Sequence, residues 1–152
     1  MTQMTGSCEC GAASFKVSAK PLARAYCHCT ICQEFNKADY ADVSVFLSRD
    51  VTLEDPATVA MKSYKKTPPS VQRGKCRKCD KPALEYLDMP LLPGLTIIPS
   101  ANIAATLPEP SMHIFYHRRK RDIQDDLPKH SGFLKSQWCF AKQLLPGIVR
   151  AY

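Results

Sequence analysis

The chain has 152 residues, with 21 Lys and Arg against 14 Asp and Glu, which gives a formal net charge of +7. This length suits one domain that buries a core of its own, so we expect a single domain over residues 1–152. Residues 1–10 hold no apolar segment of the kind a secretory signal needs, and no apolar run is long enough to span a membrane. A membrane partner is therefore not expected.

Short strands are predicted along most of the chain, because prolines are frequent and scattered and the apolar runs between them are short. Residues 13–18 alternate between apolar and polar side chains and read as a strand. Further strands are predicted over residues 43–47, 95–98 and 112–116. The fold class expected from this pattern is mainly β.

The C-terminal segment has a different periodicity. Its apolar side chains recur at helical spacing, which predicts a C-terminal helix that Pro146 and Gly147 would end. Packing against the sheet and contact with a second copy of the chain both remain open as roles for this helix. The apolar residues are Phe133, Leu134, Trp138, Ala141, Leu144 and Leu145.

Seven of the eight cysteines fall into three tight clusters, Cys8–Cys10, Cys27–Cys32 and Cys76–Cys79. Thiolates spaced two or three residues apart suit a tetrahedral zinc ion, whereas a disulfide between residues i and i+2 is strained. The spacing therefore favours metal sites, and we expect two Zn²⁺ per chain. Thiols that stay free for metal indicate a reducing compartment, so a cytoplasmic location is expected.

A structural zinc site is predicted from two cysteine pairs that lie far apart in the sequence. Cys8 and Cys10 point to the same side of an extended segment, and Cys76 and Cys79 have ordinary zinc spacing. Four thiolates complete the coordination of zinc and leave no position for a substrate. The ion would fasten the N-terminal strand to a distant hairpin.

A second zinc site is predicted at Cys27, Cys29 and Cys32, which supply three thiolates. Three protein ligands plus one open position are typical of a reactive zinc, and a fourth protein ligand would make the site structural. His28 is expected to point away from its neighbours on a strand, and Cys139 is expected to be a small buried residue. The other histidines, expected on the surface or in strands, are His113, His117 and His130.

An open site with three thiolates favours an incoming thiol, because the negative sulfurs weaken the ability of zinc to polarise a carbonyl. A small-molecule thiol is therefore the expected substrate, with Cys27, Cys29 and Cys32 as the catalytic group. The other interpretation of this site is a second structural zinc without catalysis.

Two basic runs, Lys62–Lys66 and His117–Arg121, are expected to be solvated faces. The alternative function is a basic zinc-binding module for nucleic acid or protein partners, because Phe115 and Tyr116 precede the second run and could stack on bases. The basic excess is small for such a role, so nucleic acid is the less favoured partner.

Together these motifs resemble the glutathione-dependent formaldehyde-activating enzyme family, which includes the centromere protein V-like proteins. The resemblance runs over about residues 5–133. Residues 6–12 resemble the opening Gly-x-Cys-x-Cys-Gly of the family, residues 27–32 its Cys-His-Cys-x-x-Cys, and residues 73–84 its Cys-x-x-Cys segment. Residues 110–114 and 126–128 resemble its late strand and exit.

This resemblance implies an Mss4-like, zinc-stapled β-sheet fold with residues 134–152 as a C-terminal extension. It implies a structural zinc at Cys8, Cys10, Cys76 and Cys79, and a labile zinc at residues 27–32. The implied activity is that of a carbon–sulfur lyase or synthase, which adds the thiol of glutathione to formaldehyde to give S-hydroxymethylglutathione, or reverses this step. The donor that stabilises the developing alkoxide remains open among Thr30, His28 and a backbone N–H.

The sequence departs from the family pattern at several positions. Asp80 stands where the family has Gly, in a turn whose left-handed conformation Asp tolerates. Lys75 stands where an aromatic residue precedes Cys76, and Lys120–Arg121 replace an expected Trp. These departures concern the substrate pocket more than the metal sites.

Overall fold

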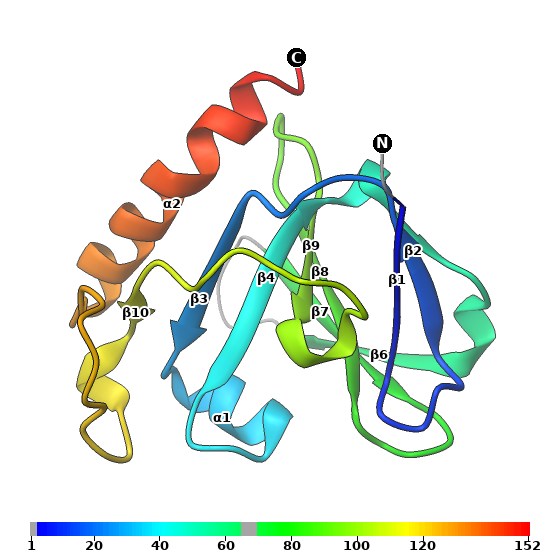
Figure 1. Ribbon diagram of the computed structural model, residues 1–152, viewed down its shortest axis with the longest axis horizontal. Coiled ribbons are helices and arrows are strands. Elements are labelled where there is room, and N and C mark those ends of the chain that lie inside the picture. Colours follow the sequence, from blue (N-terminus) through cyan, green and yellow to red (C-terminus); the bar gives the residue numbers. More distant parts are fainter. Residues whose placement is uncertain (1–2, 65–69) are drawn as a thin grey trace.

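The computed structural model describes residues 3–64 and 70–152, which form two sheets and two α-helices (Figure 1). The smaller sheet has the order β1 (Met4–Ser7), β2 (Ser14–Val17) and β5 (Val51–Leu53). The larger sheet has seven strands, in the order β10 (His113–Ile114), β3 (Ala23–Cys27), β4 (Ala41–Leu47), β9 (Leu95–Pro99), β8 (Pro82–Asp88), β7 (Ser70–Cys76) and β6 (Val59–Tyr64). The predicted mainly β fold is confirmed.

The main core lies between the two sheets. Phe15 and Val17 point inward from β2 at alternate positions, and both are fully buried against Phe46, Leu84 and Ile98 of the larger sheet. Burying an apolar side chain of this size stabilises the fold by about 1.5–3 kcal/mol. The alternation seen in the sequence thus corresponds to one face of a half-buried strand.

Three of the four predicted strands, over residues 13–18, 43–47 and 95–98, correspond to β2, β4 and β9. The strand predicted over 112–116 is shorter, because only His113 and Ile114 pair with β3. Phe115 adopts a left-handed conformation with φ 55°, and its N–H donates to Ser136 Oγ at 2.8 Å. The backbone therefore leaves the sheet after Ile114.

The predicted C-terminal helix is α2 (Phe133–Val149), and its expected end at Pro146–Gly147 is wrong. Leu144 and Ile148 flank Pro146, and both are buried against β3, β4 and β9. Gly147 lies so close to Leu22 that an added Cβ would be 2.3 Å from Leu22 Cδ2. Packing of this last turn offsets the cost of an internal proline, which is about 3 kcal/mol.

Helix α2 lies along the outer edge of the molecule (Figure 1), and one of its faces is exposed. Leu134, Trp138 and Val149 are 80%, 62% and 68% exposed, so packing against the sheet accounts for Leu144 but not for these side chains. The contact with a second copy expected as an alternative remains a prediction, which the mass of the protein in solution would test.

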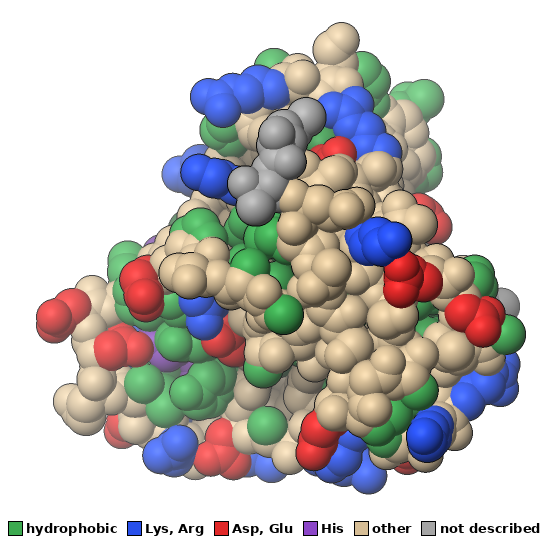
Figure 2. All heavy atoms as spheres, turned by 45° about the vertical axis from the view of Figure 1, so that its right-hand side comes forward, with side chains coloured by type: hydrophobic (Ala, Val, Ile, Leu, Met, Phe, Trp, Pro, Cys, Tyr) green, Lys and Arg blue, Asp and Glu red, His purple; other side chains and the backbone are tan. Residues whose placement is uncertain are grey.

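Charged side chains of both signs are interspersed on the face that Figure 2 presents. In the second basic run, Arg119 pairs with Asp122 and Arg121 with Asp39. In the first run, Lys62 is exposed, while Lys65 and Lys66 lie outside the described residues. None of the helices in the described parts of the chain is sufficiently long and apolar to span a membrane.

Candidate metal centres

The four-cysteine centre joins the two sheets at their turns. Cys8 and Cys10 lie in the turn between β1 and β2, Cys76 ends β7, and Cys79 lies in the turn to β8. All four sulfurs lie within 4.8 Å of one another, so the fold brings together the four cysteines named above for one metal ion. Their role as structural zinc ligands stays a prediction.

The sulfur spacing in this centre fits zinc. Cys10 Sγ is 3.6 Å from Cys8 Sγ and 3.7 Å from Cys76 Sγ. Zn–S bonds of about 2.3 Å in a tetrahedron place sulfurs about 3.8 Å apart. A disulfide needs about 2.05 Å, and all eight cysteines are free thiols. The donor set and its spacing are therefore compatible with a zinc ion.

Backbone turns orient these sulfurs. The turn after Cys8 is closed by Gly11, whose φ is +83° and whose N–H donates to the carbonyl of Cys8. In the second turn the N–H of Asp80 donates to the carbonyl of Cys76, and Asp80 takes the left-handed conformation expected for it, with φ 58°. The backbone N–H groups of Cys79 and Lys78 lower the pKa of Cys76 to about 6, which favours the thiolate.

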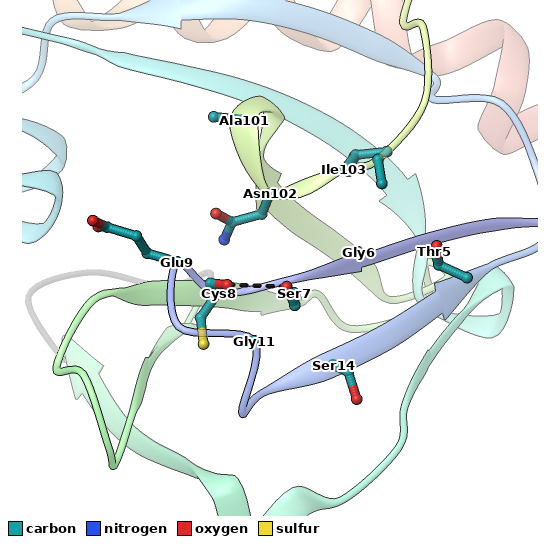
Figure 3. A pocket seen from close by; sticks show the side chains of 11 residues that line it. Thr5, Gly6, Ser7, Cys8, Glu9, Gly11, Ser14, Ala101, Asn102 and Ile103 are labelled. Atoms are coloured by element: carbon teal, nitrogen blue, oxygen red, sulfur yellow. Dashed lines mark hydrogen bonds between the residues drawn. The ribbon is translucent and has the colours of Figure 1, made fainter.

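A groove borders this centre, between the β1–β2 turn and residues 101–104 (Figure 3). Cys8 is the only cysteine that lines it, and in Figure 3 its sulfur points away from Asn102 on the opposite wall. The groove includes no residue of the three-cysteine cluster. It therefore offers a substrate no access to those three thiols.

The three-cysteine centre lies where β3 passes into α1 (Thr30–Asn36). Cys27 is the last residue of β3, Cys29 caps the helix by accepting a hydrogen bond from the N–H of Cys32 at 3.3 Å, and Cys32 lies in the first turn. The three sulfurs lie within 4.8 Å of one another. The sequence does not predict α1, because seven residues give too short a window for helical periodicity and cysteine is not a common helix cap.

No fourth metal ligand joins this group among the residues that the structure describes. Neither His28 nor Cys139 belongs to it. The expectation that Cys139 is buried is wrong, because its side chain on α2 is partly exposed. Cys27 and Cys32 are buried and Cys29 is partly exposed, so the centre is open toward solvent at Cys29. Hydrogen bonds from Cys27 and Cys32 lower the pKa of Cys29 to about 3.

A buried hydrogen-bond chain starts at His28, and no local pattern in the sequence indicates it. His28 Nε2 lies 2.8 Å from His113 Nδ1, and His113 Nε2 lies 2.7 Å from Asp125 Oδ2. Lys129 Nζ donates to Asp125 Oδ1 at 2.6 Å. Burial, together with His113 and Arg119, lowers the pKa of His28 to about 4, so its ring is neutral at pH 7.

A buried ion pair lies on the other side of the three-cysteine centre, and no local pattern indicates it either. Arg73 on β7 pairs with Glu85 on β8. Arg73 Nη1 also lies 4.0 Å from Cys32 Sγ, and its guanidinium lies over the ring of Phe35 on α1. Burial raises the pKa of Glu85 to about 7, against the opposing effect of Arg73. A cation thus faces the thiolates from the larger sheet.

The family model of the glutathione-dependent formaldehyde-activating enzyme matches residues 3–118, a range that holds both cysteine centres. The chain therefore belongs to the glutathione-dependent formaldehyde-activating enzyme family. No curated protein matches the sequence. The match ends before α2. That residues 134–152 form an extension of the family domain stays a prediction.

Proposed function

We propose that the protein is a zinc-dependent carbon–sulfur lyase or synthase acting on a glutathione–aldehyde adduct, with S-hydroxymethylglutathione as the adduct of formaldehyde. The family match supports this function, since the family activates formaldehyde with glutathione. The observation that carries the proposal is the contrast between the two centres. One has four sulfurs, and the other has three sulfurs with Cys29 partly exposed.

In this proposal Cys8, Cys10, Cys76 and Cys79 hold a structural zinc, and Cys27, Cys29 and Cys32 hold the second zinc. A zinc ion held by these three thiolates would supply an open coordination position, which favours the thiolate form of an incoming thiol near pH 7. The residues around it then have to orient the substrate, balance charge and limit water.

The overall reaction conserves atoms and charge. The thiol of glutathione loses its proton, its sulfur forms a bond to the carbon of formaldehyde, and the carbonyl electron pair moves to oxygen, which takes up a proton. Three thiolates make the centre electron-rich, and Arg73 places a compensating cation 4.0 Å from Cys32 Sγ. Thr30 and backbone N–H groups remain the candidate donors to the oxygen. His28 is not one of them, because its ring is buried and its Nε2 is bonded to His113.

The charge near the centre suits a substrate that carries carboxylates. Gln33 on α1 donates both to the carbonyl of His28 and to the carbonyl of Arg118, at 2.8 and 2.9 Å. These bonds place the basic run His117–Arg121 beside the helix that carries Cys32. Arg118 and Lys120 are exposed there and available to an anionic ligand.

The alternative, a basic zinc-binding module without catalysis, receives less support. Arg119 and Arg121 form ion pairs with Asp122 and Asp39, which reduces the positive charge that a nucleic acid would meet. We place the protein in the cytoplasm, because eight free thiols, seven of them grouped for metal, require a reducing compartment.

The test is exchange spectroscopy of glutathione and formaldehyde with and without the zinc-loaded protein. We expect the protein to increase the exchange rate above the uncatalysed rate, and Cys29→Ser to remove the increase. Cys139→Ser, which changes a cysteine outside both centres, is the matched control and should leave the rate unchanged. An exchange rate that is the same with and without protein would exclude this activity for formaldehyde.

A further inference from the structure

His28 separates the two ligand residues Cys27 and Cys29, and its side chain is only 1% exposed. Its direction determines how the chain passes from the end of β3 to the cap of α1. A small change in the backbone conformation of His28 alters the directions of both thiols, since His28 is the residue between Cys27 and Cys29. What holds His28 therefore bears on the geometry of the three-cysteine centre.

Three attachments hold His28. Its N–H donates to the carbonyl of Ile114 at 3.0 Å, and its carbonyl accepts from Gln33 Nε2 at 2.8 Å. The third attachment is the side-chain bond between His28 Nε2 and His113 Nδ1, at 2.8 Å. Only this third bond depends on the side chain of His113, so a substitution there can test it separately.

His113 is itself fixed on several sides. It is fully buried, its N–H donates to the carbonyl of Pro128, and its carbonyl accepts from the N–H of His130. Its Nε2 bonds to Asp125, whose other oxygen accepts from Lys129. The carboxylate of Asp125 favours a proton on His113 Nε2, and in that tautomer His113 Nδ1 accepts from His28 Nε2–H.

Aromatic rings enclose the two histidines. Tyr40 and Tyr116 each lie with their ring centroid 5.1 Å from that of His28, and Tyr26 lies 5.0 Å from His113. This enclosure keeps water from the histidine pair. If the bond between His28 and His113 is lost, a bond to bulk solvent therefore cannot replace it. The hydrogen-bond chain runs from the partly exposed Asp125 through His113 to His28, between the two cysteines.

We propose that His113 is a positioning residue of the three-cysteine centre, which fixes the Cys27–His28–Cys29 segment through its hydrogen bond to His28 and so holds two thiols in metal-binding directions. This inference rests on the second metal site of the proposed function, and it does not depend on the reaction. Residues that orient a metal ligand from outside the coordination sphere change metal affinity by about 10–100-fold when they are substituted.

The experiment uses the full chain loaded with Co²⁺, whose thiolate absorption reports cysteine coordination. Release of Co²⁺ to a chelator in excess is followed in time. The phase that is absent in Cys29→Ser belongs to the three-cysteine centre, and the remaining phase belongs to the four-cysteine centre, which serves as a control inside the same molecule.

We expect His113→Leu to speed release from the three-cysteine centre by about tenfold or more and to leave release from the four-cysteine centre unchanged. His113→Asn, whose side-chain oxygen can still accept a hydrogen bond from His28, should recover part of the difference. Asp125→Asn changes the partly exposed residue at the end of the hydrogen-bond chain, and it should speed release from the three-cysteine centre by a smaller factor.

Tyr116→Phe is the matched control. Tyr116 packs against both histidines, but its hydroxyl accepts from the N–H of Ile123 and takes no part in the hydrogen-bond chain. It should leave Co²⁺ release unchanged at both centres. The proposal is overturned if His113→Leu leaves the three-cysteine phase unchanged, if it speeds both phases equally, or if Tyr116→Phe has the same effect. If the phases respond as expected and no formaldehyde exchange is seen, the proposed function alone has failed.

Discussion

Arg73 and Glu85 face each other across β7 and β8, and they form an ion pair of which less than a tenth of either side chain is exposed. The same guanidinium reaches Cys32 Sγ and the ring of Phe35. The pair therefore links the larger sheet to α1, the helix that carries part of the three-cysteine centre.

Loss of one member of this pair should strongly destabilise the protein. Glu85→Gln leaves the charge of Arg73 buried without its carboxylate, and such changes cost about 3–5 kcal/mol of unfolding free energy. Urea denaturation of the metal-loaded protein measures the difference. Glu54→Gln, in the exposed pair with Lys16, is the control and should cost no more than about 1 kcal/mol.

The double variant Arg73→Met with Glu85→Leu should recover most of this stability, because replacing both charges with apolar groups removes the need to bury them. The double variant should still change the electrostatic environment of the three-cysteine centre, since the cation beside Cys32 is gone. A double variant no more stable than Glu85→Gln would contradict this account of the pair.

The two metal centres should respond differently to the loss of one cysteine. Cys79→Ala breaks the closed centre that joins the β1–β2 turn to the β7–β8 turn, and zinc binding of order 10 kcal/mol contributes to folding in such sites. We expect this variant to lose the folded circular dichroism spectrum. Cys29→Ser should remain folded, because β3 and α1 keep their other contacts, and should bind one metal ion per chain by elemental analysis.

The control for both is Cys139→Ala, which should remain folded with two metal ions. A fully metal-free protein with an unchanged spectrum would show that the four-cysteine centre does not support the fold.

The ring of His28 should be neutral at pH 7. Its pKa is lowered to about 4, so the folded state takes up a proton only well below the pH at which an unfolded histidine does. In the hydrogen-bond chain it donates through Nε2, and Nδ1 has no partner among the described residues. Two-bond proton–nitrogen NMR correlations should show the Nε2-protonated tautomer of His28. A doubly protonated His28 ring would contradict this prediction.

The two faces of α2 should differ sharply in their contribution to stability. Leu144 is buried against β3, β4 and β9, so Leu144→Ala should cost about 2–3 kcal/mol by urea denaturation. Its neighbour Leu145 is 48% exposed and provides a matched substitution, Leu145→Ala, which should cost under about 1 kcal/mol. Equal losses would mean that the exposed face is covered, for example by a second copy of the chain.

Much of the fold could be predicted from local patterns. The alternation around Phe15 and the apolar run at Leu95–Ile98 predict strands, because one face or both faces of a strand must be buried. The end of α2 could not be predicted, since Pro146 and Gly147 normally stop a helix and only the contact with Leu22 and the burial of Ile148 carry it further. Tertiary packing there outweighs local preference.

The cysteine spacing by itself identified the ligand groups of both candidate metal centres, because thiols two or three residues apart can reach one ion. The fold then brought Cys10 to Cys76, which is 66 residues away in the sequence. Only the tertiary structure decided what surrounds the two centres. Arg73 and Glu85 are ordinary charged residues in the sequence, and His113 is 85 residues from His28. Their roles depend on strand pairing between distant segments, and a sequence carries no local signal for a contact made across a sheet.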